Sequence, residues 1–150
     1  MRSDNRMLGA IFILAVMAVP ANCQCRPTSA PTRWGGNERV TMAEPKPVKS
    51  IHGVTLGFGD GKPLSGVLVE IYDHPEILTR TFTPDPGAKK RIAACITDET
   101  GVFALNVPPG HYELRLSKSF EWDVLSMPVR VEKSAPYSKK GFELSLKLGT

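Results

Sequence analysis

The sequence predicts an all-β protein, an antiparallel β-sandwich of about seven strands with Greek-key connections. Three observations lead to this prediction. From residue 50 onward, apolar and polar residues alternate in short runs, and a period of two is typical of strands. Turn sequences rich in Gly, Pro and Asp separate these runs. After the N-terminal region, no stretch of ten or more residues repeats its apolar residues with the helical period of 3.6. Helices are therefore expected to be minor at most.

The expected strands follow one another at short intervals. They cover residues 51–59, 67–72, 91–97, 103–107, 112–116, 124–131 and 141–148. In the second strand, Val67, Val69 and Ile71 share one face, opposite Leu68, Glu70 and Tyr72. In the last strand, four apolar side chains are expected to face the core: Phe142, Leu144, Leu146 and Leu148.

The N-terminal 21 residues have the pattern of a secretory signal peptide. Arg2 and Arg6 precede an uncharged run of thirteen residues, Met7 to Val19. A helix that crosses a bilayer needs about twenty apolar residues, so a signal cleaved after Ala21 fits better than a membrane anchor. We expect a secreted, periplasmic or cell-envelope protein without a transmembrane helix in its mature chain.

Two cysteines follow the signal closely. A lipid anchor at Cys23 or Cys25 is an alternative to simple secretion, but the residues before each cysteine do not match a lipoprotein cleavage site. Cys95 lies in a strand-like run, where it is expected to be a small buried apolar residue. A disulfide from Cys95 to Cys23 or Cys25 is the other interpretation, and the sequence leaves both open.

Residues 22–49 are expected to form a flexible linker, and residues 50–150 the sandwich domain. The linker segment is rich in Pro, Ser, Thr and Arg and has few apolar residues with which to offset the entropy of ordering. The chain has a net charge of +4, and its basic residues are spread along the sequence without a basic stripe interleaved with aromatic residues. Nucleic acid is therefore not an expected partner.

Two turns and a tyrosine have predicted structural roles. Asp98 to Gly101 suits a type I turn that continues into a bulge, because Gly101 tolerates a positive φ. Pro109 and Gly110 occupy the second and third positions expected of a type II turn. Tyr112 follows in the pattern L-x-V-P-P-G-x-Y, which resembles a tyrosine corner, where the hydroxyl bonds to upstream backbone.

Three motifs together resemble a known family. They are G-x-P-L-S-G-V-x-V at 61–69, T-D-x-x-G-x-F-x-L at 97–105 and V-P-P-G-x-Y-x-L-x-L at 107–116. In this order they resemble the carboxypeptidase regulatory-like domain, a transthyretin-like (prealbumin-like) sandwich with Ig-like architecture. The resemblance implies an accessory module rather than a particular activity.

The same fold class implies two other functions. Starch-binding-like modules stack sugars on exposed rings, and the candidate rings here are Tyr72, Trp122 and Tyr137. Transthyretin-like hydrolases end in a Y-R-G-S signature, whereas this chain ends in L-K-L-G-T. A hydrolase activity is therefore the less favoured of the two.

No catalytic residue, metal site or cofactor is predicted. The three histidines, His52, His74 and His111, lack the spacing of metal ligands, and no serine lies in a G-x-S-x-G motif. The sequence predicts a non-catalytic module that binds an envelope protein or a glycan.

The predicted binding segment is the stretch of eighteen residues from His74 to Arg91, which is long for a connection between strands. Its candidate contact residues are His74, Glu76, Arg80, Phe82, Lys89, Lys90 and Arg91. The alternative is that Ile77, Leu78 and Phe82 fold back to cover one end of the sandwich.

Overall fold

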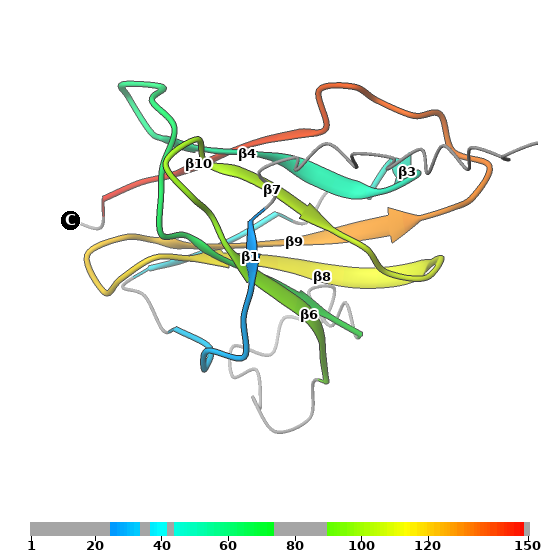
Figure 1. Cartoon of the computed structure of the whole chain (residues 1–150), viewed down its shortest axis with the longest axis horizontal. Coiled ribbons are helices and arrows are strands. Elements are labelled where there is room, and N and C mark those ends of the chain that lie inside the picture. The colour runs from blue at the N-terminus through cyan, green and yellow to red at the C-terminus, as the bar shows by residue number, and fades with distance from the viewer. Residues whose placement is uncertain (1–24, 34–36, 42–43, 74–89, 149–150) are drawn as a thin grey trace, which may run out of the picture.

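The computed structural model describes residues 25–33, 37–41, 44–73 and 90–148, which form two packed β-sheets (Figure 1). The described strands are β1 (Arg26–Pro27), β2 (Glu38–Val40), β3 (Pro47–Val48), β4 (Ile51–Gly57), β5 (Leu68–Tyr72), β6 (Arg91–Ile96), β7 (Val102–Leu105), β8 (Gly110–Ser117), β9 (Val124–Val131) and β10 (Phe142–Leu146). The seven strands expected from the sequence correspond to β4 through β10. The all-β sandwich is confirmed.

The larger sheet has the strand order β1-β6-β5-β8-β9-β2, and β3 also pairs with β9. The smaller sheet has the order β10-β4-β7. The sequence predicted antiparallel pairing throughout, but three pairs are parallel. β10 runs parallel to β4, and β2 and β3 run parallel to β9. The connection from residue 132 to 141 carries the chain from one sheet to the other, which lets β10 enter beside β4 in the same direction.

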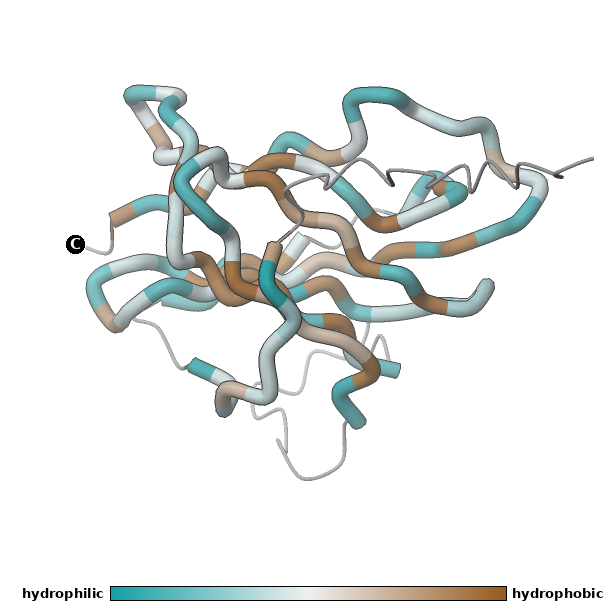
Figure 2. The backbone as a smooth tube through the Cα atoms, viewed as in Figure 1, coloured by the Kyte–Doolittle hydropathy of each residue, from teal (hydrophilic) through white to brown (hydrophobic). Residues whose placement is uncertain are grey.

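The core lies between the two sheets, where Figure 2 shows the apolar segments converging. The larger sheet contributes Val69, Ile71, Leu114 and Leu116, and the smaller sheet contributes Ile51, Phe103, Leu144 and Leu146. The predicted inward face of the last strand is correct for Leu144 and Leu146, and Phe142 packs partly against the core. It is wrong for Leu148, which lies beyond β10 and is 61% exposed.

The described part of residues 25–49 is built into the sandwich and is not the flexible linker that its composition suggested. Cys25 forms a disulfide with Cys95, and β1 pairs with β6 beside it. Further along, β2 and β3 pair with the edge of β9. This folded unit therefore includes Cys25 instead of beginning near residue 50. The composition misled because a disulfide, strand pairing and polar contacts hold the segment, and these need few apolar residues.

The disulfide shows which cysteine pairs with Cys95. Cys95 is 1% exposed and is both buried and bridged, and its partner is Cys25. The Cys25 sulfur is thus occupied, whereas a lipid thioether would need it free. Cys23 and the expected signal peptide, residues 1–21, lie outside the described residues. Within the described ranges there is no helix long and apolar enough to cross a membrane.

Candidate functional site

One end of the sandwich carries a group of exposed apolar side chains. Phe58 lies just after β4, Phe120 and Trp122 lie in the turn between β8 and β9, and Leu148 follows β10. Phe58, Phe120 and Leu148 are 61%, 78% and 61% exposed, and Trp122 is half-buried against the core. We call Phe58, Phe120, Trp122 and Leu148 the aromatic end. Of the seven exposed large apolar residues in the described chain, three belong to it.

Backbone contacts fix the three segments of the aromatic end to one another. The Phe58 amide donates to the Leu146 carbonyl at 2.9 Å, and Trp122 forms an isolated bridge with Leu148. The Asp123 amide donates to the Lys147 carbonyl at 2.8 Å, while the Lys147 amide donates to an Asp123 carboxylate oxygen at 2.7 Å. The rings are therefore presented on a connected scaffold.

A pocket of about 350 Å³ opens among these segments. Phe58, Trp122 and Leu148 supply apolar wall, and Asp60, Lys62 and Lys147 supply charged groups. Such a volume lies within the range of small-ligand pockets, roughly 300–1,000 Å³. A larger pocket of about 410 Å³ is lined by residues such as Lys49, Pro108 and Lys133, without an aromatic side chain.

Basic side chains lie directly against the rings of the aromatic end. The Lys147 ammonium is 4.2 Å from the centre of the Phe58 ring, and the Lys118 ammonium is 5.3 Å from the centre of the Trp122 ring. Both distances are within the range of cation–π attraction. Arg33 donates to the carbonyls of Gly66 and Lys118 at 3.0 and 2.8 Å, which brings a further cation to this end.

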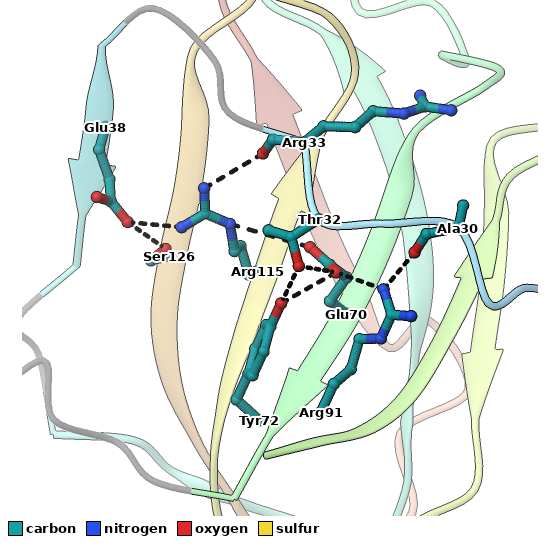
Figure 3. A network of polar contacts seen from close by, with 9 residues as sticks. All are labelled: Ala30, Thr32, Arg33, Glu38, Glu70, Tyr72, Arg91, Arg115 and Ser126. Atoms are coloured by element: carbon teal, nitrogen blue, oxygen red, sulfur yellow. Dashed lines mark hydrogen bonds and ion pairs between the residues drawn. The ribbon is translucent and has the colours of Figure 1, made fainter. Parts of the chain in front are cut away.

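A second cluster of charged residues lies on the outer face of the larger sheet, beneath the N-terminal segment (Figure 3). At its centre is the fully buried Glu70. One oxygen of its carboxylate accepts hydrogen bonds from Thr32 at 2.9 Å, Tyr72 at 3.0 Å and Arg91 at 2.9 Å. The other oxygen is 4.0 Å from Nε of Arg115.

The cluster continues toward β2 and the N-terminal segment. Arg115 contacts a Glu38 carboxylate oxygen at 3.2 Å and donates to the Arg33 carbonyl at 3.3 Å. Ser126 donates to the same Glu38 oxygen at 2.8 Å, and Arg91 donates to the Ala30 carbonyl. These groups bind the protein's own chain. The cluster therefore fastens the N-terminal segment to the sheet.

Most of the predicted binding segment, His74 to Arg91, lies outside the described residues. This part includes His74, Glu76, Arg80, Phe82 and Lys89. At its base, the Lys90 amide donates to an Asp73 carboxylate oxygen at 3.0 Å, and the Asp73 amide donates to the Lys90 carbonyl at 3.1 Å. Arg91 is the first residue of β6 and contacts buried Glu70, so its guanidinium belongs to the charged cluster.

The turn at Asp98 has the expected geometry. Gly101 has a φ of +67°, and its amide donates to the Asp98 carbonyl at 3.0 Å. The Asp98 carboxylate accepts from the hydroxyl and the amide of Thr100 at 2.6 and 2.9 Å. These two bonds hold the pKa of Asp98 below its usual value. A side chain at Gly101 would also meet the Thr55 carbonyl at 2.6 Å.

The second predicted turn differs from expectation. Pro109 is exposed and precedes β8, but Gly110 begins that strand, pairs with Val131 and lacks the positive φ that a type II turn requires. A Cβ at Gly110 would lie 3.0 Å from the Tyr112 hydroxyl, so a larger residue here would require the Tyr112 ring to shift slightly. That hydroxyl donates to the Pro108 carbonyl at 2.8 Å, which is the contact expected of a tyrosine corner.

The three rings considered for sugar binding have different surroundings. Tyr72 is 8% exposed and belongs to the charged cluster, where burial raises the pKa of its hydroxyl. Tyr137 is 63% exposed and stacks on His52, with ring centres 5.5 Å apart. Only Trp122 of the three lies at the aromatic end. Phe58 and Phe120 were not among the candidate rings: Phe58 was assigned to the expected strand 51–59, whereas β4 ends at Gly57.

The described residues contain no group of three or more His, Cys, Asp or Glu side chains placed to hold a metal ion. No protein-family model matches the chain, and no curated protein matches it. One solved structure with some likeness is the 3-chlorocatechol 1,2-dioxygenase of Rhodococcus opacus 1CP, with a TM-score of 0.42 and 12% identity. The alignment covers 83% of this chain and 72% of the dioxygenase. A likeness of this size carries no argument about activity.

Proposed function

We propose that the protein is a non-catalytic, exported β-sandwich that acts by binding at the cell envelope, with the aromatic end as its binding surface. The observation that carries this proposal is that Phe58 and Leu148, both more than half exposed, line one pocket with Trp122, while the exposed Phe120 lies in the same turn as Trp122. Single exposed apolar residues are ordinary on protein surfaces, whereas grouped ones mark interaction sites. Aromatic side chains supply much of the energy at such sites.

The segment from His74 to Arg91 is the competing surface, as the sequence analysis proposed. A single experiment separates the two. The mature chain is immobilised and used to capture components of a solubilised envelope fraction. Phe58→Ser with Phe120→Ser tests the aromatic end. Replacing residues 75–89 by a short Gly-containing turn tests the segment, because Asp73 and Lys90 already bond to each other at its base.

We expect the double Phe variant to lose the captured component, and the shortened-segment variant and a Tyr137→Ser control to retain it. Tyr137 is a suitable control because it is equally exposed but lies away from the aromatic end. If the shortened segment alone abolishes capture, the binding surface is that segment, and the assignment to the aromatic end is wrong. Thermal unfolding of each variant checks that the sandwich is intact.

A glycan is the second candidate ligand, and the pocket itself favours it. Phe58 and Trp122 give apolar wall, and the Asp60 carboxylate is an acceptor for sugar hydroxyls. Against this, a lysine ammonium lies over each ring, where a sugar would have to stack. Calorimetric titration with neutral oligosaccharides tests this candidate. Binding that disappears in the double Phe variant would support it, and no heat of binding would exclude these ligands.

A further inference from the structure

We infer that the aromatic end docks on the surface of a bilayer that contains anionic lipid. This inference rests on the proposed function, because it uses the same surface and names its partner. The rings of Phe58 and Phe120 would enter the boundary between headgroups and acyl chains. The lysines beside them would contact lipid phosphates.

The first argument is the shape of the surface. Phe58 and Phe120 lie on two separate turns at the same end of the sandwich, where the chain leaves β4 and β8 (Figure 1). They are 61% and 78% exposed, so most of each ring is available for contact. Aromatic side chains on projecting turns can enter a bilayer interface without any change in the sandwich, and that interface is where such rings are enriched.

The second argument is charge. Four basic side chains lie at this end, Arg33, Lys62, Lys118 and Lys147, and so do four acidic ones, Asp60, Asp98, Glu99 and Glu121. Asp123 is also near, but it is paired with Arg39 at 3.1 Å. The end as a whole is therefore balanced, but the charged groups that lie over the rings are the ammonium groups of Lys118 and Lys147. These two groups are the ones expected to attract lipid phosphate.

The third argument is that the apolar and basic groups are in direct contact. The ammonium groups of Lys147 and Lys118 lie over the rings of Phe58 and Trp122, and the flexible alkyl stem of a lysine lets its ammonium group move outward when the ring inserts. A lysine in this position can keep its charge at the phosphate level while the ring enters deeper. An acidic protein with an apolar anchor would meet the same groups, and the experiment below treats it as a separate outcome.

The test is flotation of the mature chain with vesicles of phosphatidylcholine alone, or of phosphatidylcholine mixed with phosphatidylglycerol. We expect binding to the mixed vesicles, weaker binding to the neutral ones, and loss of the difference at high salt. Phe58→Ser with Phe120→Ser should weaken binding by more than about tenfold. Lys62→Gln with Lys147→Gln should remove most of the preference for anionic lipid.

Two control variants match these changes at the opposite end of the molecule. Tyr137→Ser removes an exposed ring, and Lys139→Gln with Lys140→Gln removes two exposed charges in the connection before β10. Both should bind vesicles as the unchanged protein does. The inference is wrong if the unchanged protein floats with neither kind of vesicle, or if the double Phe variant floats equally well.

The outcome also separates this inference from the proposed function. If the double Phe variant loses an envelope protein or a glycan while the unchanged protein ignores both vesicle types, the aromatic end is a binding surface and its partner is not a membrane. If neither assay depends on Phe58 and Phe120, both the proposed function of this surface and the inference fail.

Discussion

At the scale of single residues, Tyr112 links the turn before β8 to the strand itself. Its ring packs in the core cluster while its hydroxyl donates to the Pro108 carbonyl at 2.8 Å. Gly110 leaves the space that this ring occupies. The contact therefore fixes the entry of the chain into β8, which pairs with β5 on one side and β9 on the other.

Tyr112→Phe should lower the free energy of unfolding by about 1 kcal/mol or more, because it leaves the Pro108 carbonyl without its donor. Urea unfolding of the variant and the unchanged protein measures the difference. Tyr137→Phe is the matched control, because Tyr137 is 63% exposed and should tolerate the change. Equal stability of the two variants would contradict a corner role for Tyr112.

Tyr72 should make the protein sensitive to alkaline pH. Burial raises its pKa above the ordinary 10.0, and the neighbouring Glu70 carboxylate acts in the same direction. A group with a raised pKa in the folded state contributes stability that is complete below the pKa of the unfolded state and is lost as pH rises through the folded value. We therefore expect the free energy of unfolding to fall above about pH 10.

Urea unfolding from about pH 8 to about pH 11 measures this dependence. Tyr72→Phe should reduce the slope of the fall, although the variant is less stable at all pH values because Glu70 loses a hydrogen bond. Tyr137→Phe should keep the slope of the unchanged protein. A slope that does not change in Tyr72→Phe would show that other groups cause the alkaline loss.

At the scale of elements, the N-terminal segment closes both edges of the larger sheet. β1 covers β6 at one edge, and β2 and β3 cover β9 at the other. Between these contacts, Thr32 and Glu38 reach the charged cluster on the sheet's outer face (Figure 3). Unpaired strand edges invite association with other chains, so this arrangement also protects the fold.

Removing the disulfide should destabilise the protein by roughly 2–4 kcal/mol, since the bridge joins residues 70 positions apart and constrains the unfolded chain. Cys25→Ser with Cys95→Ser is the test, because it leaves no unpaired thiol from this pair. Cys23→Ser is the control and should leave the melting temperature unchanged. If Cys23→Ser were equally harmful, the assignment of Cys25 as the partner of Cys95 would be in error.

At the scale of the whole molecule, the sandwich presents different groups at its two ends. The aromatic end gathers turns from both sheets, and Arg39 ties the sheets together there by contacting Asp123 and the Ser145 carbonyl. The opposite end carries Tyr137, His52 and the exposed Lys139 and Lys140. The binding and vesicle experiments described above test this difference between the ends.

The sequence by itself determined the sandwich and its seven main strands. Alternation such as Val69 and Ile71 against Glu70 and Tyr72 requires a strand, because only a period of two places these side chains on opposite faces. The turn at Gly101 was equally readable, because a positive φ favours glycine. These features depend on neighbours in the chain, which a sequence displays directly.

The tertiary structure alone decided the place of the N-terminal segment and the aromatic end. Glu70 and Tyr72 lie on the face of β5 opposite the core, and both are buried because the N-terminal segment reaches them, as in the contact of Thr32 with Glu70, 38 positions away. Phe58, Trp122 and Leu148 are likewise distant in sequence and meet only because β4 and β10 end beside the start of β9. Contacts of this kind depend on how strands are ordered in the sheets, and alternation carries no information about that order.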